Sequence, residues 1–181
     1  MAAKPKKEFS IKLPKLFGEK IIGKTLADHQ RKIIGRKFTI YAKDIWENTP
    51  KYYYKLSFRI DSVENGNAVA SFIGHEISRA FISKNVKKNS TRIDSYIKGI
   101  TKDNATIVLK PIVITAKRVK TSVASAIRKE MNKFLELYIK ENSVDKIIKD
   151  IVSDDLQKDL RKTLNVIYPL SVVEIRKSEL K

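Results

Sequence analysis

The segment GEKIIGKT, from Gly18 to Thr25, has the residue types and spacing of a phosphate-binding loop. Its two glycines are separated by four residues and are followed by Lys24 and a threonine, which matches the P-loop pattern of nucleotide-binding proteins. That chemistry requires a buried strand before the loop and a helix after it, so that backbone N–H groups face the phosphates. The preceding residues FSIKLPKLF contain two lysines and one proline, Lys12, Lys15 and Pro14, and make a poor buried strand. We therefore interpret the match as accidental, and a P-loop NTPase is the enzyme alternative.

The other residues that could do chemistry form no catalytic set. The chain has no cysteine and two histidines, His29 and His75. His75 stands beside Glu76 without a candidate nucleophile nearby, so we interpret it as a structural hydrogen-bonding residue. The paired carboxylates Asp154 and Asp155 are explained by a helix start, whose positive dipole end they favour. We predict no catalytic residue, no metal site and no cofactor, and therefore no enzyme.

Positive charge is the strongest global feature of the sequence. The 181 residues include 38 Lys and Arg against 20 Asp and Glu, a formal net charge of +18. An excess of this size indicates a polyanionic partner, either a nucleic acid or an anionic membrane surface. Residues 1–120 hold 26 basic against 10 acidic residues, whereas residues 121–181 hold 12 against 10. The first two thirds of the chain are therefore predicted to face the polyanion.

The expected cellular setting follows from what the sequence lacks. Without cysteine there is no disulfide and no thiolate metal site. No apolar run approaches the roughly 18 residues needed to cross a bilayer, and the basic start MAAKPKKEFSIKLPK has no apolar signal-peptide core. We expect a soluble, cytoplasmic protein, with 42% hydrophobic residues to build one sizeable core.

Two parts are predicted: residues 1–24 as a basic extended arm, and residues 25–181 as a single domain. The arm interleaves lysines with prolines and phenylalanines and shows no sustained helical or strand period. Arms of this kind often become ordered when they lie on nucleic acid. The alternative is a tail that only aids solubility.

The segment from Thr115 to Tyr138 combines a basic run with a helix. Residues 117–120 precede Thr121 and Ser122, both good N-cap residues. Apolar residues then recur at helical spacing, at Val123, Ile127, Met131, Phe134 and Tyr138. Cations and unpaired backbone N–H groups converge at such a start, which suits it to hold phosphates. The alternative is a core helix with a solvated basic face.

Period-two patterns predict strands in the middle of the chain. Residues 52–60 have an apolar or aromatic side chain at every even position, and Asn65-Gly66 predicts a hairpin to residues 68–73. Tyr52 and Tyr54 are thereby predicted to face the core, which leaves Tyr53 as a base-stacking candidate. A second pair of strands is expected at 92–100 and 105–114, where Pro111 requires an edge or a bulge.

Later segments read as short helices and a last strand. Helices are expected after three serine N-caps, at Ser78, Ser143 and Ser153. The final strand is expected at 172–177, with Glu174 on its outer face. Together these elements predict an α+β fold: an antiparallel, barrel-like sheet with flanking helices.

Several motifs resemble one family, the S-three-A-e (S-one-e) small-subunit ribosomal proteins of archaea and eukaryotes. The matching segments are LFGEKIIGKT at 16–25, IGRKF at 34–38, AVASFIGHEISRAFI at 68–82 with the following SKNVKK, KPIVITAKRVKTS at 110–122, AIRKEM at 126–131 and IYPLSVVEIRK at 167–177. The overall length is similar to that of archaeal members.

The resemblance implies a β-barrel with flanking helices, built into the platform of the small ribosomal subunit. It places the protein near the mRNA exit and the 3′ end of the rRNA, beside neighbouring ribosomal proteins. It also implies that the segment from Gly18 to Thr25 binds no nucleotide.

We therefore predict a structural rRNA-binding protein whose basic side chains hold phosphates and give little sequence specificity. The candidate RNA contacts are Lys4, Lys6, Lys7, Lys12, Lys15, Lys24, Arg36, Lys84, Lys87, Lys88, Lys117, Arg118, Lys120 and Arg128. The nearly neutral region after residue 121 is expected to face the core and protein neighbours, with mRNA near the exit as a further partner. The non-enzymatic alternative is a DNA- or RNA-coating protein outside the ribosome.

Overall fold

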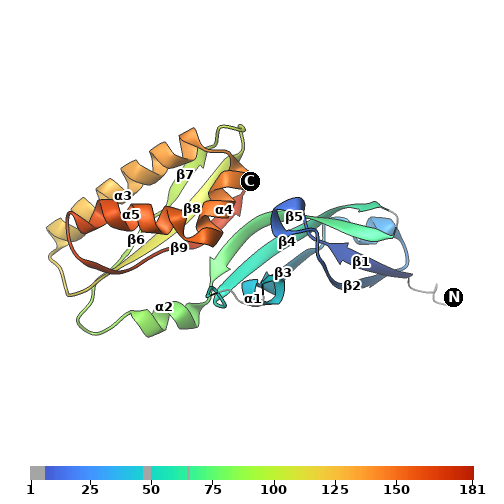
Figure 1. Cartoon of the computed structure of the whole chain (residues 1–181), viewed down its shortest axis with the longest axis horizontal. Helices are drawn as coiled ribbons and strands as arrows, with labels where there is room; N and C mark the ends of the chain where they lie inside the picture. The colour runs from blue at the N-terminus through green and yellow to red at the C-terminus, as the bar shows by residue number, and fades with distance from the viewer. Residues whose placement is uncertain (1–6, 47–49, 65) are drawn as a thin grey trace. The chain divides into compact units, whose positions relative to one another are not determined.

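The chain divides between Gly74 and His75 into unit 1 (Met1–Gly74) and unit 2 (His75–Lys181). Figure 1 shows the computed structural model, which describes residues 7–46, 50–64 and 66–181. The predicted boundary between arm and domain, at residues 24 and 25, falls inside a strand. The boundary between the two units also falls inside a strand.

Unit 1 consists mainly of strands. Its elements are β1 (Lys7–Lys12), η1 (Lys15–Phe17), β2 (Ile21–Ala27), η2 (Gln30–Lys32), β3 (Lys37–Tyr41), α1 (Ala42–Ile45), β4 (Tyr54–Glu64) and most of β5 (Asn67–Ile77). β1 runs antiparallel to β2 and parallel to β5, and β3 runs antiparallel to β4. Because β4 also pairs with β5, the strands of unit 1 follow the order β2-β1-β5-β4-β3.

Apolar side chains explain why residues 7–24, assigned to the arm from the sequence, form β1, η1 and part of β2. Phe9, Leu13 and Phe17 are buried among the residues of unit 1. The Phe17 ring packs edge-on against Phe58 with 5.2 Å between centroids, and at 5.4 Å from Phe72. Burial of these three side chains stabilises the segment even though Lys12 and Lys15 lie between them: Lys15 is exposed, and Lys12 is paired with Glu19. Residues 1–6 of the predicted arm lie outside the described residues.

The alternation predicted for β4 is confirmed from Tyr54 onward. Tyr54 and every second residue to Ile60 are buried. Tyr52 was predicted to face the core, and this was wrong: it precedes the strand and is 58% exposed. The predicted hairpin is present between β4 and β5, with Gly66 at φ +80°, a left-handed conformation that favours glycine.

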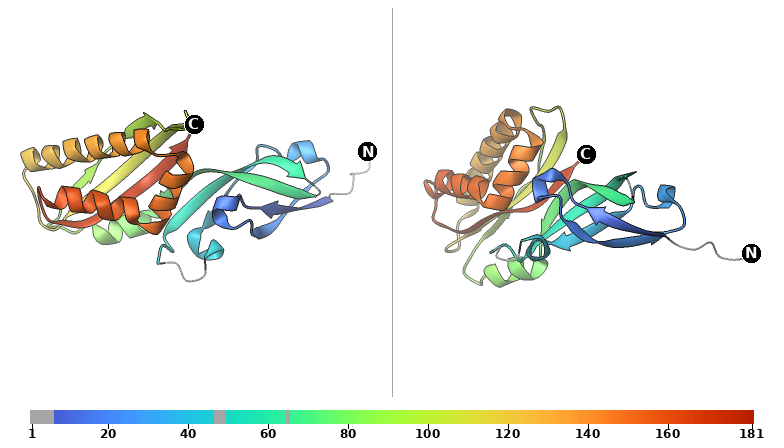
Figure 2. Two further views of the ribbon diagram at one scale, coloured as in Figure 1. Left: turned by 45° about the horizontal axis from the view of Figure 1, so that its top comes forward. Right: turned by 45° about the vertical axis from the view of Figure 1, so that its right-hand side comes forward.

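Unit 2 packs helices on a sheet. Its elements are α2 (Arg79–Asn85), β6 (Arg92–Asp94), β7 (Ile97–Ile100), β8 (Thr106–Thr115), α3 (Thr121–Glu141), α4 (Val144–Ser153), α5 (Asp155–Asn165) and β9 (Leu170–Leu180). β6, β7 and β9 all run antiparallel to β8. Figures 1 and 2 show α3, α4 and α5 together on one face of these strands.

The face of α3 that packs on the sheet differs from the predicted stripe. Ile127 and Met131 are buried as predicted, but the next buried residues are Leu135 and Ile139. Apolar residues at 134, 135, 138 and 139 permit either stripe at helical spacing. Contact with β7 selects the second, because Ile139 lies directly against Gly99.

The strand predicted at 92–100 is interrupted, so that β6 and β7 are separate partners of β8. Pro111 lies at a register shift between β8 and β9, which confirms the bulge rather than an edge position. Glu174 was predicted to face outward, and this was wrong. Its side chain is buried beside Gln157 of α5, at 3.5 Å from Nε2 to Oε2, because α5 covers that part of β9.

Of the three predicted serine caps, one makes the capping bond. Ser143 accepts a hydrogen bond from the backbone N–H of Lys146. Ser78 precedes α2 but its side chain makes no capping bond. Ser153 is the last residue of α4, and α5 begins after Asp154, whose φ of 71° ends one helix and starts the next.

The α+β class is confirmed, but the barrel-like antiparallel sheet is not. The sheet is mixed, because β1 pairs with β5 in parallel, and it is open. The strand path β2-β1-β5-β9-β8-β6 has two free ends among the described residues, with β4 and β3 branching from β5 and β7 branching from β8. The sheet does not close into a barrel because β5 is long. Its first residues pair within unit 1, while its last three belong to unit 2.

Candidate nucleic-acid interface

The basic side chains predicted in unit 1 are spread over β1, η1, β2 and the start of β3. Two of them form ion pairs on the surface: Lys12 with Glu19 at 2.6 Å, and Lys24 with Glu8 at 2.8 Å. The hydrogen bond and charge of Glu8 raise the pKa of Lys24, and those of Lys12 lower the pKa of Glu19. Both shifts favour the charged forms of Lys24 and Glu19, and the acidic partners reduce the net positive field.

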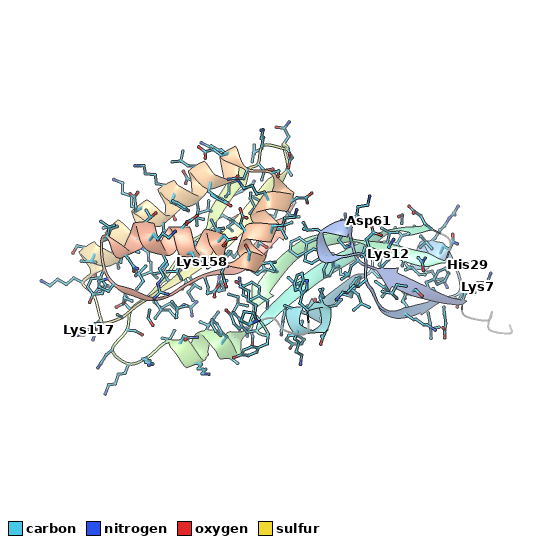
Figure 3. The ribbon with its side chains drawn as sticks, viewed as in Figure 1. Lys7, Lys12, His29, Asp61, Lys117 and Lys158 are labelled. Atoms are coloured by element: carbon cyan, nitrogen blue, oxygen red, sulfur yellow. The ribbon has the colours of Figure 1, made fainter. Side chains whose placement is uncertain are left out.

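Lys7 and Lys15 are exposed on β1 and η1, while Lys4 and Lys6 lie outside the described residues. Lys7 lies at the same end of unit 1 as His29, as Figure 3 shows. Both line a groove of about 810 Å³ together with Arg31 and Lys32. The last two were missed as candidates, although the run QRKIIGRK holds four cations within eight residues and could have indicated them.

Arg36 has a structural role at the junction of β2 and β3. Its Nη1 donates to Thr25 Oγ1 at 2.8 Å and to the Leu26 carbonyl at 3.2 Å, and its Nε donates to the Lys32 carbonyl. An arginine with this many backbone and side-chain acceptors stabilises the local fold. Any contact with RNA would be an addition to that role.

The segment from Gly18 to Thr25 does not have the architecture of a P-loop. Residues 21–27 form the strand β2, which pairs with β1, instead of a loop leading into a helix. Lys24 lies within that strand and is bound to Glu8. Backbone N–H groups that are committed to a strand ladder cannot wrap around a phosphate.

In unit 2, two basic loops far apart in the sequence are joined by threonines. Lys87 and Lys88 follow α2, while Lys117, Arg118 and Lys120 lie between β8 and α3, and all five are exposed. We call these five residues the Thr91-linked surface. Figure 3 shows Lys117 at the end of this unit where α3 begins.

The link is a compact set of hydrogen bonds between Thr91 and Thr115. The Thr91 N–H donates to Thr115 Oγ1 at 2.9 Å, and the Thr115 N–H donates to the Thr91 carbonyl at 3.0 Å. The N–H of Val119 donates to Thr91 Oγ1 at 3.1 Å, and Thr115 Oγ1 donates to the Lys117 carbonyl at 2.6 Å. The loop that carries Lys117, Arg118 and Lys120 is thus held in one shape beside the loop of Lys87 and Lys88.

The start of α3 adds backbone donors to this surface. Lys120 is the N-cap residue, without a side-chain capping bond, and the first turn contains no acidic residue. The first N–H groups of a 21-residue helix therefore point toward the same region as three cations. This arrangement can hold phosphate oxygens by charge and by hydrogen bonds.

Arg128 and Lys84 lie on helices rather than in the two loops of this surface. Arg128 is eight residues beyond Lys120, about 12 Å along the helix axis at 1.5 Å per residue. Its Nε donates to the Asp94 carbonyl at 3.2 Å, which ties α3 to the end of β6. Lys84 is exposed in the last turn of α2.

His75 is confirmed as a hydrogen-bonding residue of the interior. It is 2% exposed, with Nδ1 at 2.6 Å from Ser178 Oγ and Nε2 at 2.8 Å from the Ile175 carbonyl. Since a carbonyl only accepts, Nε2 carries the proton and Nδ1 accepts from the serine hydroxyl. Among the described residues, no group of three or more His, Asp or Glu side chains is placed to hold a metal ion. Within the same residues, no helix is both long and apolar enough to cross a membrane.

Known proteins match this chain along nearly its whole length. The model of the Ribosomal S3Ae family matches residues 2–181. Similar relatives include "Small ribosomal subunit protein eS1" of Methanothrix thermoacetophila, 33% identical over 98% of this chain and 84% of the relative. The proteins of the same name from Methanopyrus kandleri and Aeropyrum pernix are 33% and 34% identical, over 98% and 97% of this chain and 86% and 84% of theirs.

The match agrees with what the residues show. The segments with which the sequence resembled this family lie in both units, from η1 to β9. The family is one of ribosomal proteins and not of enzymes. The chain belongs to the Ribosomal S3Ae family.

Proposed function

We propose that this protein is a structural constituent of the small ribosomal subunit in the cytoplasm and that it binds small-subunit rRNA through the Thr91-linked surface. Family membership and the names of the relatives support the ribosomal role. In this proposal the protein lies on the platform, near the mRNA exit and the 3′ end of the rRNA, with mRNA and neighbouring ribosomal proteins as further partners. The basic side chains of residues 1–24 contribute further contacts with the RNA.

The observation that carries the RNA-binding part is the threonine link. Isolated surface lysines are common and lose side-chain entropy when they bind. Here Thr91 and Thr115 hold two basic loops together before RNA arrives, so less conformational entropy is lost on binding. Lys and Arg at fixed positions recognise the spacing of phosphates on folded RNA, which gives affinity and orientation with little base readout.

The test is the salt dependence of binding to a folded fragment of small-subunit rRNA. Replacing Lys117, Arg118 and Lys120 by Gln together should weaken binding and lower the slope of log K against log salt by roughly one unit per lost phosphate contact. The matched control replaces Lys149, Lys158 and Lys162 of α4 and α5 by Gln, which removes the same charge from exposed positions elsewhere in unit 2. Equal slopes for the two variants would show that the predicted cluster makes no specific phosphate contacts.

A further inference from the structure

Another basic groove, in unit 2, lies between α2 and the strands β8 and β9, and none of the candidate residues named from the sequence lines it. Its volume is about 490 Å³. Five cations line it, from α2, β6, β8 and β9, and Glu76 adds one carboxylate to the same lining; the cations are Arg79, Arg92, Lys110, Arg176 and Lys177. Such a density of positive charge in a concave site favours an anionic ligand.

Two of these cations have no acidic partner of their own. Arg92 is bound to Asp94 through two hydrogen bonds, at 2.7 and 3.0 Å. Arg79 and Arg176, in contrast, form no ion pair among the residues that the structure describes. Arginine guanidinium groups are suited to bidentate contact with phosphate and to stacking on bases.

The two lysines of the groove share one carboxylate. Glu179 lies 3.1 Å from Lys110 Nζ and 2.7 Å from Lys177 Nζ. One negative charge against two positive charges leaves the pair of lysines net positive. The Lys110–Lys177 pair also occupies directly opposed positions on β8 and β9, which holds the two side chains close together.

An exposed aromatic ring lies beside Lys110, one of the lysines that line the groove. Tyr96, between β6 and β7, is 57% exposed, and Lys110 Nζ lies 6.0 Å from its ring centroid. An exposed tyrosine next to a groove lined by cations suits the binding of unpaired nucleotides, with a base stacked on the ring and phosphates on the cations. Bases within a duplex are already stacked on each other and cannot use such a ring.

We propose that this groove binds a segment of single-stranded RNA, with phosphates on Arg79 and Arg176 and an unpaired base on Tyr96. This inference rests on the proposed function and adds a class of RNA and a second site to it. The groove volume falls in the range of about 300–1,000 Å³ seen for small-ligand pockets, a size that matches a nucleotide of a single strand better than a duplex. Glu76 can accept a hydrogen bond from a ribose 2′-hydroxyl, a group that only RNA carries.

The experiment measures binding of the full chain to a labelled single-stranded RNA of about eight nucleotides and mixed sequence. The same assay uses the duplex of that sequence and an acidic peptide of equal charge. The variants are Tyr96→Ala and the double variant Arg79→Ala with Arg176→Ala. The matched controls are Tyr41→Ala, an exposed tyrosine of unit 1 that also has lysines over its ring, and Lys158→Ala with Lys162→Ala.

Tyr96→Ala should weaken single-strand binding roughly tenfold, the effect of losing one stacked base, and leave duplex binding unchanged. The double arginine variant should lower the salt slope by about 0.7 per lost phosphate contact. Both controls should bind like the wild type. Losses that are equal for the acidic peptide and the single strand would overturn the inference in favour of a protein partner.

The RNA-binding groove and the proposed function can be refuted independently of each other. Wild-type single-strand binding by Tyr96→Ala and by the double arginine variant would refute the groove, while the Lys117, Arg118 and Lys120 variant would still lose affinity for folded rRNA. A wild-type protein that binds neither the folded fragment nor the single strand would refute both proposals.

Discussion

At the scale of single residues, buried polar groups in the interior of unit 2 stabilise the fold through hydrogen bonds to each other. The His75 ring connects β5 to β9 through Ser178 and the Ile175 carbonyl, and its own backbone N–H donates to Ser178 Oγ at 3.2 Å. A buried imidazole with both nitrogens satisfied stabilises the fold, whereas its partners would be left unsatisfied without it.

We predict that His75→Ala lowers the free energy of unfolding by about 1–3 kcal/mol, because it leaves a buried hydroxyl and a buried carbonyl without their partner and opens a cavity. Urea denaturation at neutral pH measures this change. His29→Ala is the matched control, since His29 is exposed and should change stability by less than about 0.5 kcal/mol. Similar values for the two variants would contradict the structural role.

Glu179 makes the stability of the fold depend on pH. Its hydrogen bonds with Lys177 and Lys110 lower its pKa below the ordinary value of 4.5. A carboxylate with a lowered pKa stabilises the folded state above its unfolded pKa, and this contribution is lost as the pH falls through the folded pKa.

We therefore expect Glu179→Gln to be less stable than the wild type at neutral pH, by up to about 1 kcal/mol for a partly exposed pair. The difference should vanish well below pH 4.5, where the wild-type carboxyl is protonated in both states. Urea unfolding of both proteins across this pH range measures it. A difference that is independent of pH would rule out the ion pairs as its source.

At the scale of elements, the approach of α3 to the sheet depends on one glycine. A Cβ on Gly99 of β7 would lie 2.8 Å from Ile139 Cγ2, and Ile139 is completely buried. The glycine thus allows the last turns of α3 to pack closely on β7, and it explains why Ile139, which was not predicted, belongs to the core.

We predict that Gly99→Ala destabilises the protein by about 1–3 kcal/mol, since it forces a clash in a packed interior. Adding Ile139→Ala should cost less in the Gly99→Ala background than in the wild type, because it removes the atom that clashes. Gly23→Ala is the control, because its Cβ would meet nothing within 4 Å. Chemical denaturation of the wild type, the two single variants at positions 99 and 139 and the double variant gives the coupling energy between these positions. Purely additive effects would contradict the close approach of α3 to β7.

At the scale of the whole molecule, two parts of the chain differ in net charge. Residues 1–120 carry most of the net charge of +18, whereas residues 121–181, which form α3, α4, α5 and β9, are nearly balanced. Such an asymmetry suits a protein that binds RNA with one part and protein neighbours with another, because the strength of phosphate binding follows local charge.

We expect the full chain to co-sediment with particles of small-subunit size in a sucrose gradient at moderate salt and to dissociate as salt rises. The Lys117, Arg118 and Lys120 variant should dissociate at lower salt than the wild type. A wild-type protein that is absent from such particles at moderate salt would contradict the ribosomal role, and equal binding to duplex DNA would favour a nucleic-acid-coating protein.

The sequence alone determined the class of fold, most strands and helices, and the ribosomal family. Local patterns were sufficient for these, because the alternation in β4, the turn at Gly66 and the cap at Ser143 depend on neighbours in the chain. It also indicated the basic residues at 87–88 and 117–120, since charge is visible without any fold, although Lys87 and Lys88 were expected on a helix that ends at Asn85.

Only the tertiary structure determined which segments of the chain are neighbours in space. The parallel pairing of β1 with β5, the burial of Glu174 under α5 and the packing face of α3 depend on partners distant in sequence, which periodicity does not specify. The same holds for the surface that joins the basic loops, because the hydrogen bonds of Thr91 with Thr115 span 24 residues. Charge can be counted along a chain, but its concentration on one surface is set by the fold.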